Sequence, residues 1–260
     1  MSYVESLFSL EGKVAVVIGG SGVLGGSMAQ ALGQASSKVA VGYHNNAAGA
    51  EKVVRAIEQA GGTAKAVQVD TASEAGVEKG KNAIISLWGK IDIVVNAPGV
   101  NSTTPVFDIS DEEWSKILDT NLKGIFLSCR VFAKQMIKQK TGGSIVNISS
   151  VSSGPPLSRV FTYSISKAGV NNMTRFLAKE WAPHKIRVNA IMPGFFPAEQ
   201  NRKILTEERR KSIFAHTPMA RYGEPNELSG ALLWLASEQA SSFVTGAVVP
   251  VDGGFTSMTI

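Results

Sequence analysis

The sequence predicts an α/β fold in which helices cover both faces of one parallel, doubly wound sheet. Short runs rich in valine and isoleucine alternate along the chain with longer segments whose apolar residues recur every three to four positions. The short runs show little alternation of apolar and polar residues, which is typical of strands buried on both faces. Because strand–helix–strand crossovers are right-handed, this repeat predicts a parallel sheet, here of seven strands.

The expected elements follow one another in order along the chain. The seven strands are expected at residues 13–18, 38–43, 64–69, 91–95, 144–149, 186–191 and 247–251. Helical periodicity marks segments between them, including 47–60, 112–138, 163–181 and 225–235. The sequence shows no linker or internal repeat, and 260 residues with 44% hydrophobic content suit one core. Residues 1–260 are therefore expected to form a single domain.

One segment, at about residues 193–218, breaks this rhythm. It contains prolines at 193, 197 and 218, the pair Phe195-Phe196 and a polar helical stretch. Connections of this length are uncommon in compact domains unless they are functional or disordered. Since the segment follows the end of a strand, where α/β sheets bind ligands, we expect it to form a substrate lid.

Composition and charge argue against several classes of protein. The formal net charge is +5, but basic residues are mixed with acids, as at 207–211, so nucleic acid is not an expected partner. No stretch approaches the roughly 20 apolar residues of a membrane span, and residues 1–11 lack the pattern of a signal peptide. Cys129 is the only cysteine and lies in an apolar run, which indicates a core residue. We therefore expect a cytoplasmic protein with no membrane partner, and the spacing of His, Cys, Asp and Glu predicts no metal site.

A glycine-rich turn joins the first strand to the helix that follows it. Glycine lets the backbone approach a pyrophosphate closely, and the N-terminus of a helix supplies free N–H groups and positive potential. Strand, turn and helix together favour a Rossmann-like dinucleotide site, although glycine also serves simple tight turns. The candidate cofactor contacts in this turn are Gly19, Ser21, Gly22, Val23 and Leu24.

Polar residues at the ends of the third and fourth strands support this interpretation. Asp70 and Thr71 follow the third strand, and Asn96-Ala97-Pro98-Gly99 follows the fourth. A carboxylate at this edge can accept a hydrogen bond from an adenine amine, and a turn of small residues lets a nucleotide lie against the backbone. Asp and Asn also end strands for local hydrogen-bonding reasons, so both interpretations stay open.

Ser150, Tyr163 and Lys167 are the strongest candidates for a catalytic site. Ser150 ends the fifth strand, Tyr163 follows thirteen residues later, and Lys167 stands four residues beyond, on the same face of a helix. The lysine ammonium is expected to favour the phenolate and so to lower the pKa of Tyr163 from its usual value of about 10. The Ser150 hydroxyl could then hold a substrate oxygen beside the Tyr163 hydroxyl.

A Tyr-x-x-x-Lys pair alone is common by chance, but here it coincides with the glycine turn, a serine at a strand end and Asn121 in the run 119–122. Together these residues resemble the short-chain dehydrogenase/reductase family, in its single-domain form, from Leu10 to the C-terminus. The resemblance implies an enzyme that moves a hydride between a nicotinamide and an alcohol or ketone substrate.

The family resemblance also implies roles for individual residues. Asn121, Ser150, Tyr163 and Lys167 would be the catalytic residues, with Tyr163 as acid/base, and Tyr163 and Lys167 would also contact the nicotinamide ribose side. Asn121 would hold a proton-relay water. Pro193, Gly194 and Phe196 would contact the cofactor from the loop after the sixth strand, and residues 251–254 resemble the family's C-terminal signature. Tetramers are common in the family, so a homotetramer is expected.

The sequence departs from the family pattern at three places. Ile18 and Val23 replace a threonine and the middle glycine of the usual first turn, with a glycine instead at Gly22. The usual Asn-Asn-Ala-Gly is Asn-Ala-Pro-Gly at 96–99, and Ala198 replaces a threonine that usually reaches the carboxamide. These departures affect the detail of cofactor binding.

The turn after the second strand bears on the choice of cofactor. Relatives that prefer NAD tend to have an acid there, whereas this chain has Tyr43-His44-Asn45-Asn46, so no carboxylate repels a 2′-phosphate. Tyr43, His44 and Asn45 are candidate cofactor contacts, and NADP(H) is favoured over NAD(H). Against this, Gly22 occupies a position where many NADP-dependent relatives have Arg or Lys.

The substrate is predicted only as a class. The glycine turn, the run 101–104 and the run 193–202 resemble the D-mannonate and gluconate type of oxidoreductase. This favours a sugar acid, a polyol or a small ketone, with Ser150, Tyr163, Phe195 and Gln200 as candidate substrate contacts. Phe195 and Phe196 could equally wall an apolar pocket or pack the lid. A 3-oxoacyl-thioester reductase and a non-catalytic nucleotide sensor remain as alternatives.

Overall fold

Seven parallel strands form one sheet in the computed structural model, which describes residues 2–197 and 206–258. Their order across the sheet is β3-β2-β1-β4-β5-β6-β7, and every neighbouring pair is parallel. The strands are β1 (Val14–Ile18), β2 (Lys38–Tyr43), β3 (Thr63–Gln68), β4 (Ile93–Asn96), β5 (Gly143–Ile148), β6 (Ile186–Pro193) and β7 (Val248–Val251). The predicted fold class is confirmed.

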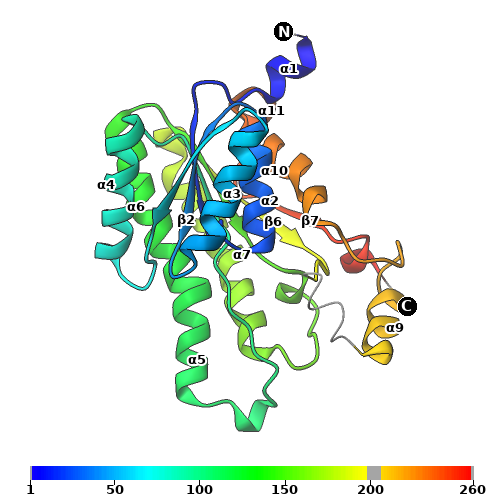
Figure 1. Ribbon diagram of the computed structural model, residues 1–260. Helices are drawn as coiled ribbons and strands as arrows, with labels where there is room; N and C mark the ends of the chain where they lie inside the picture. The colour runs from blue at the N-terminus through cyan, green and yellow to red at the C-terminus, as the bar shows by residue number, and fades with distance from the viewer. Residues whose placement is uncertain (1, 198–205, 259–260) are drawn as a thin grey trace.

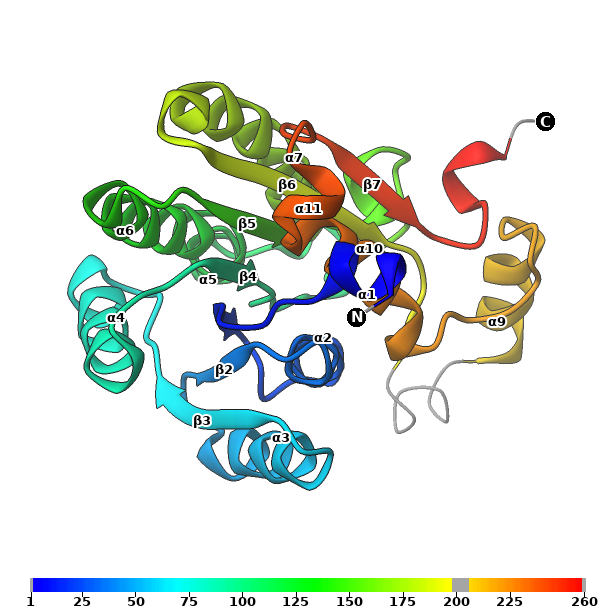
Figure 2. The ribbon, with the colours of Figure 1, turned by 90° about the horizontal axis from the view of Figure 1, so that it is seen from above.

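Helices cover both faces of this sheet (Figures 1 and 2). Each face buries its own apolar cluster, which explains why the strands need no polar side. One face carries α2 (Val23–Gln34), α3 (Ala47–Gln59) and α10 (Ser229–Ala236), and the other carries α4 (Glu74–Trp88), α6 (Gly124–Gln139) and α7 (Phe161–Trp181). The remaining α-helices of the described chain are α1 (Tyr3–Phe8), α5 (Asp111–Leu118), α9 (Glu207–Ala215) and α11 (Glu238–Ser241).

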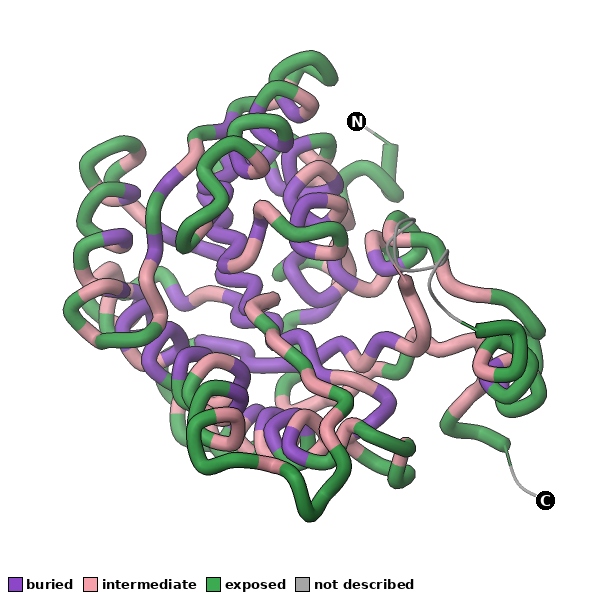
Figure 3. Tube along the Cα trace, turned by 60° about the horizontal axis from the view of Figure 1, so that its bottom comes forward, coloured by how far each residue is buried: buried purple, intermediate pink, exposed green. Residues whose placement is uncertain are grey.

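The central strands are buried along their whole length. All five residues of β1 and all four of β4 are buried, and Val16, Val95 and Ile145 have no exposed surface. Figure 3 shows the buried sheet at the centre, with exposed residues on the outer sides of the helices. β-branched side chains suit this setting because they fill a pleated surface packed on both sides.

The bounds of most strands differ by one or two residues from the prediction, and one expected helix is interrupted. The helix expected at 112–138 is interrupted by a π-helical turn, Asp119–Lys123, between α5 and α6. Hydrophobic periodicity does not reveal such a turn because it changes the helix by a single residue. β6 also runs two residues beyond its expected end, because Met192 and Pro193 pair with β7.

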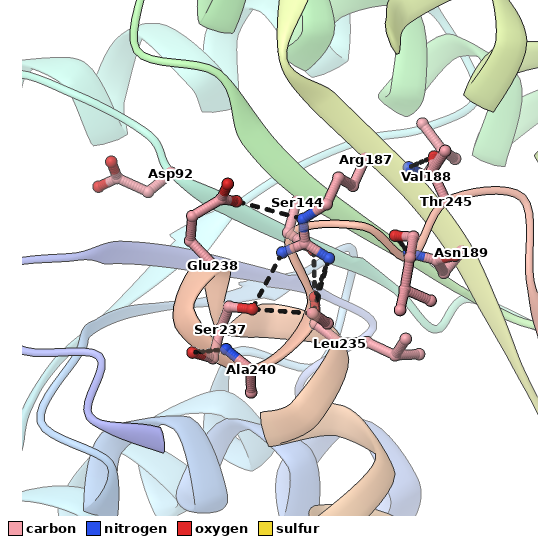
Figure 4. Close-up of polar contacts among 12 residues, drawn as sticks. Asp92, Ser144, Arg187, Val188, Asn189, Leu235, Ser237, Glu238, Ala240 and Thr245 are labelled. Carbon is pink, nitrogen blue, oxygen red and sulfur yellow. Dashed lines mark hydrogen bonds and ion pairs between the residues drawn. The ribbon is translucent and has the colours of Figure 1, made fainter. Parts of the chain in front are cut away.

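Arg187 ties the C-terminal helices to the amino end of β6 (Figure 4). Its Nη1 donates hydrogen bonds to the Leu235 carbonyl and to Ser241 Oγ, both at 2.9 Å, and its Nε lies 3.2 Å from Glu238 Oε2. Ser237 Oγ in turn donates to the carbonyl of Leu7. These contacts provide hydrogen-bond partners for a buried cation and join Leu7, α10 and α11 to the sheet, at the edge opposite the carboxyl ends of the strands.

Within residues 2–197 and 206–258, no helix is both long enough and apolar enough to cross a membrane. The 21-residue helix α7, for example, carries Lys167, Arg175, Lys179 and Glu180. In the same ranges, no three His, Cys, Asp or Glu side chains lie close enough together to hold a metal ion.

Candidate active site

The glycine turn and the turn after β4 meet at the carboxyl edge of the sheet. β1 lies between β2 and β4, so the connections from β1 and β4 leave toward opposite faces and open a crevice there. A Cβ atom added to Gly19 would stand 2.8 Å from the Ala97 carbonyl oxygen, and Gly19 has a φ of +77°. Only glycine lets these two turns approach this closely.

The start of α2 has the features of a phosphate cradle. Gly22 is the N-cap and provides no side-chain hydrogen bond to the first turn, so the first N–H groups of α2 have no side-chain cap. A Cβ on Gly25 would stand 2.2 Å from the Gly19 carbonyl oxygen, so backbone packs directly on backbone here. Both features fit a dinucleotide pyrophosphate, whose charge the helix dipole would favour.

The ends of β2 and β3 bring two of the predicted cofactor residues together. His44 Nε2 lies 3.6 Å from Asp70 Oδ1, and both side chains are exposed. Asp70 Oδ1 also accepts a hydrogen bond from the backbone N–H of Ala72 at 2.9 Å. Thr71 lies beside the start of α6, since a Cβ on Gly124 would stand 3.0 Å from Thr71 Oγ1. Tyr43 and Asn45 flank His44 at this edge.

Asn96 lies differently from what the sequence indicates. Its side chain has no exposed surface, donates to Asn147 Oδ1 at 2.9 Å and accepts from Ser128 Oγ at 2.6 Å. The buried Cys129 belongs to the same network, and burial raises the pKa of its thiol to about 12. The Asn96 amide therefore links β4 to β5 inside the core, which restricts any cofactor contact by this residue to its backbone.

Ser150, Tyr163 and Lys167 do come together. Ser150 follows β5, and both other residues lie on α7. Lys167 Nζ lies 5.7 Å from the centroid of the Tyr163 ring and donates a hydrogen bond to the Ile148 carbonyl at 2.8 Å. The Ser150 side chain is close enough to the Tyr163 hydroxyl to lower the pKa of that hydroxyl. The three groups thus occupy one spot at the carboxyl end of β5.

The pKa of Tyr163 shifts in the direction opposite to the sequence prediction. Burial raises it above 10.0, and the hydrogen bond from Ser150 only partly opposes that rise. Burial also lowers the pKa of Lys167, from 10.5 to about 8. The prediction considered the lysine charge and left out the loss of water around the phenol, which disfavours the phenolate. The Tyr163 hydroxyl is accordingly protonated near pH 7.

The lowered pKa of Lys167 predicts a pH-dependent contribution to stability. Between about 8 and 10.5 the unfolded chain holds a proton on this lysine that the folded chain has lost, so the free energy of unfolding rises with pH across that window. We expect Lys167→Met to remove this rise and Lys52→Met, an exposed control on α3, to keep it. Urea unfolding at several pH values measures both, and parallel curves for wild type and Lys167→Met would contradict the assignment.

Asn121 is central to the π-helical turn and has no exposed surface. Its Oδ1 accepts from the Val100 N–H, and its Nδ2 donates to the Val100 carbonyl, both at 2.8 Å, and to Ser166 Oγ at 3.1 Å. A Cβ on Gly99 would stand 3.8 Å from Asn121 Oδ1 and 3.9 Å from Lys167 Nζ. Asn121 therefore lies near Lys167, with its side chain joining the turn after β4 to α7.

Ser152 is a neighbour of the site that the sequence interpretation missed. Its backbone N–H and its hydroxyl donate to Ser150 Oγ at 3.2 and 3.0 Å. With two donors on Ser150 Oγ, the Ser150 proton is left to point toward Tyr163 or a ligand. A serine whose hydroxyl accepts from the N–H two residues later is a known local turn, so the Ser-x-Ser spacing was the available signal.

The predicted lid contacts divide into two groups. Phe196 packs against the core, and a Cβ on Gly223 would stand 2.3 Å from its ring. Phe195 instead makes an edge-to-face contact with Phe255, and the two ring centroids lie 5.4 Å apart. Pro193 ends β6, and the Gly194 N–H donates to the Val251 carbonyl at 2.9 Å. Gln200 and Ala198 lie outside the described residues.

The whole chain is similar to known oxidoreductases. Residues 21–256 match the family model described as enoyl-(acyl carrier protein) reductase. The uncharacterized oxidoreductase UxuB of Bacillus subtilis (strain 168) is 39% identical, over 95% of this chain and 96% of that protein. The 3β-hydroxysteroid dehydrogenase 1 of Eggerthella lenta is 40% identical, over 95% of each protein.

A solved structure agrees in sequence and in fold. The gluconate 5-dehydrogenase of Burkholderia cenocepacia J2315, crystallised with NADP and tartrate, superposes with a TM-score of 0.92 at 30% identity, covering 99% of this chain and 100% of that one. These matches extend over the strands, turns and helices that build the crevice. The chain belongs to the short-chain dehydrogenase/reductase family and is an NAD(P)-dependent oxidoreductase acting on alcohol and ketone groups.

Proposed function

We propose that this enzyme interconverts the alcohol and ketone forms of a sugar acid, a polyol or a small ketone, with NADP(H) preferred over NAD(H). Asn121, Ser150, Tyr163 and Lys167 are the proposed catalytic residues. The observation that carries the proposal is the position of Tyr163, close to the Ser150 side chain and with Lys167 Nζ 5.7 Å from the centroid of its ring. The gluconate substrate class is that of a relative similar over the whole chain.

The chain's own residues supply the proton chemistry. A bound nicotinamide supplies or accepts the hydride. In reduction, the Tyr163 hydroxyl gives its proton to the substrate oxygen as the C=O bond becomes C–O–H, and in oxidation the phenolate takes that proton back. Ser150 Oγ donates a hydrogen bond to the same oxygen, and the Lys167 ammonium stabilises the phenolate left by the transfer. The raised pKa of Tyr163 suits the donor role.

The cofactor preference rests on the end of β2. His44 is exposed there, and no acid stands among residues 43–46 to repel a 2′-phosphate. We expect His44→Asp to shift the ratio of kcat/KM values for NADPH and NADH by at least about 10-fold toward NADH, because a carboxylate would face the phosphate. Steady-state kinetics with both cofactors measures the shift.

His184→Asp is the matched control, because it makes the same change of charge at an exposed position after α7. It should leave the cofactor ratio unchanged. An equal shift in both variants would assign the effect to net charge, and no shift in His44→Asp would remove the end of β2 from cofactor selection.

The proposed substrate class is tested by a panel. Oxidation of NADPH and of NADH is followed with fructuronate, 5-ketogluconate, a neutral ketose and acetoacetyl thioesters. Turnover of the sugar acids or of the neutral ketose supports the proposal. Turnover of the thioesters alone overturns it in favour of the second candidate, a 3-oxoacyl-thioester reductase, which would share only the acyl-carrier thioester with the enoyl reductase of the matching family model.

The proposal extends to a single catalytic domain, a homotetramer and a cytoplasmic location. Apolar side chains stand exposed on α6 and α7, among them Phe126 at 37% and Phe176 at 69%, which supports association through these helices. A free thiol such as that of Cys129 persists in a reducing compartment. Sedimentation equilibrium at micromolar concentration tests the tetramer, which a monomer mass would overturn.

A further inference from the structure

One pocket is lined by the loop after Ser150, by α9 and by the C-terminal segment, and we call it the Arg209 pocket. It encloses about 460 Å³, which is within the range of small-molecule sites. One wall is the stretch 155–158, which lies in the sequence between Ser150 and Tyr163, and a second wall is Phe195, just after β6. Because β5 and β6 are neighbours in the sheet, both walls begin at the edge where Ser150 lies.

The remaining walls come from α9 and the C-terminal segment. Arg209 and Ser212 lie on α9, His216 is its C-cap, and Phe255 packs on Phe195. In Figure 1, α9 stands beside the C-terminal end of the chain and away from the two helix layers. The pocket is therefore formed by loops and one helix attached to the sheet edge, where ligand specificity usually resides.

Arg209 supplies the charge in the described lining of the Arg209 pocket, which also includes His216. Arg209 Nη1 donates to Ser158 Oγ at 2.7 Å, which joins α9 to the loop after Ser150 and leaves the other guanidinium N–H groups for a ligand. His216 Nδ1 lies 2.8 Å from the Ser212 carbonyl, so Nε2 is the ring nitrogen that remains. Among the described residues that line the pocket there is no Asp or Glu.

Two acids close to this pocket in sequence are engaged elsewhere. Glu207 pairs with Arg210 at 2.7 Å on an exposed part of α9. Asp252 accepts hydrogen bonds from the N–H groups of Gly254 and Thr256, both at 2.9 Å, and from the Thr256 hydroxyl at 2.6 Å. Among the described residues that line the pocket, no carboxylate balances the charge of Arg209.

A neighbouring pocket of about 400 Å³ shares Phe195 but differs in charge. There Arg221 donates two hydrogen bonds to Glu227, at 2.8 and 2.7 Å, and these bonds lower the pKa of Glu227 to about 2. That arginine is already paired with a carboxylate of the protein. Of these two pockets, the Arg209 pocket is the one suited to an anion.

We infer that the Arg209 pocket binds the carboxylate end of an anionic substrate, with Arg209 as the specificity-determining residue and His216 as a second donor. A planar guanidinium can hold a carboxylate through two parallel hydrogen bonds, an interaction that a neutral polyol cannot reproduce. Phe195 and Leu157 offer apolar surface to the carbon chain. The inference rests on the proposed function and names the part of the sugar acid that is recognised.

The test compares Arg209→Gln with Arg210→Gln, a matched control whose arginine pairs with Glu207. Kinetics with NADPH are measured for 5-ketogluconate and for D-fructose, which lacks the carboxylate. We expect Arg209→Gln to raise KM for 5-ketogluconate about 10- to 100-fold, with kcat within about threefold, because a charged hydrogen bond is lost. KM for D-fructose should stay unchanged in Arg209→Gln. In Arg210→Gln, KM should stay unchanged for both substrates.

Binding provides a readout that does not depend on turnover. Calorimetric titration of D-gluconate into the enzyme saturated with NADPH should show a loss of affinity in Arg209→Gln and none in Arg210→Gln. Equal effects on acid and neutral substrates, unaltered gluconate binding in Arg209→Gln, or no gluconate binding to wild type would each overturn the inference. The proposed function fails separately, when the wild-type enzyme turns over neither sugar acids nor neutral ketoses.

Discussion

Replacing Tyr163 with phenylalanine should lower kcat at least about 1,000-fold, which corresponds to about 4 kcal/mol of lost transition-state stabilisation. The substitution removes the hydroxyl proposed to pass a proton to the substrate oxygen and keeps the ring beside Lys167. The cofactor should bind with an affinity within about twofold of wild type, because the remaining cofactor contacts are intact. Stopped-flow turnover and fluorescence titration with NADPH measure the two quantities.

Tyr3→Phe serves as the control for this loss. Tyr3 lies on α1 and is 77% exposed, at the end of the fold away from the crevice, so both quantities should stay at wild-type values. Substantial turnover by Tyr163→Phe would assign the proton transfer to another group. It would also revive the alternative that the crevice binds nucleotide for a purpose other than this chemistry.

Substituting Gly25 with valine should weaken cofactor binding at least about 100-fold. A Cβ at this position would lie 2.2 Å from the Gly19 carbonyl oxygen, and backbone cannot rotate away as a side chain can. The glycine turn must therefore move off the start of α2, which displaces the N–H groups proposed to hold the pyrophosphate. Fluorescence titration with NADPH gives the affinity, and circular dichroism shows whether the fold is retained.

Gly230→Ala is the matched control for the glycine turn. Gly230 is also helical, on α10, but a Cβ there meets no atom within 4 Å, so the substitution should leave cofactor affinity unchanged and slightly raise stability. If Gly25→Ala, the milder change, folds and binds NADPH as tightly as wild type, the turn is not the phosphate cradle.

The sequence predicts the sheet well because each strand carries its own evidence. Val14–Ile18 and residues 93–95 are unbroken apolar runs bounded by polar or small residues, which is the pattern of strands buried on both faces. The helix spacing of Tyr163 and Lys167 likewise fixes their common face before any coordinates are known. Local pattern and final position agree at these elements.

Where the prediction failed, the deciding interactions were between distant residues. The pKa of Tyr163 depends on how much water the surrounding elements exclude, which no local pattern reports. Asn96 points into the core because Ser128 and Asn147, from α6 and β5, offer it partners. Arg209 is brought to its pocket only when α9 packs against the loop after Ser150.

The arrangement of the walls also bears on how such an enzyme can diverge. The groups proposed for proton transfer all lie between residues 121 and 167, anchored to β5 and α7, whereas much of the Arg209 pocket is built from α9 and the last turn of the chain. Mutations can therefore remodel what enters the crevice without disturbing the reaction performed there. Such modularity offers a physical route by which descendants of one ancestor could come to act on carbohydrates and sterols alike.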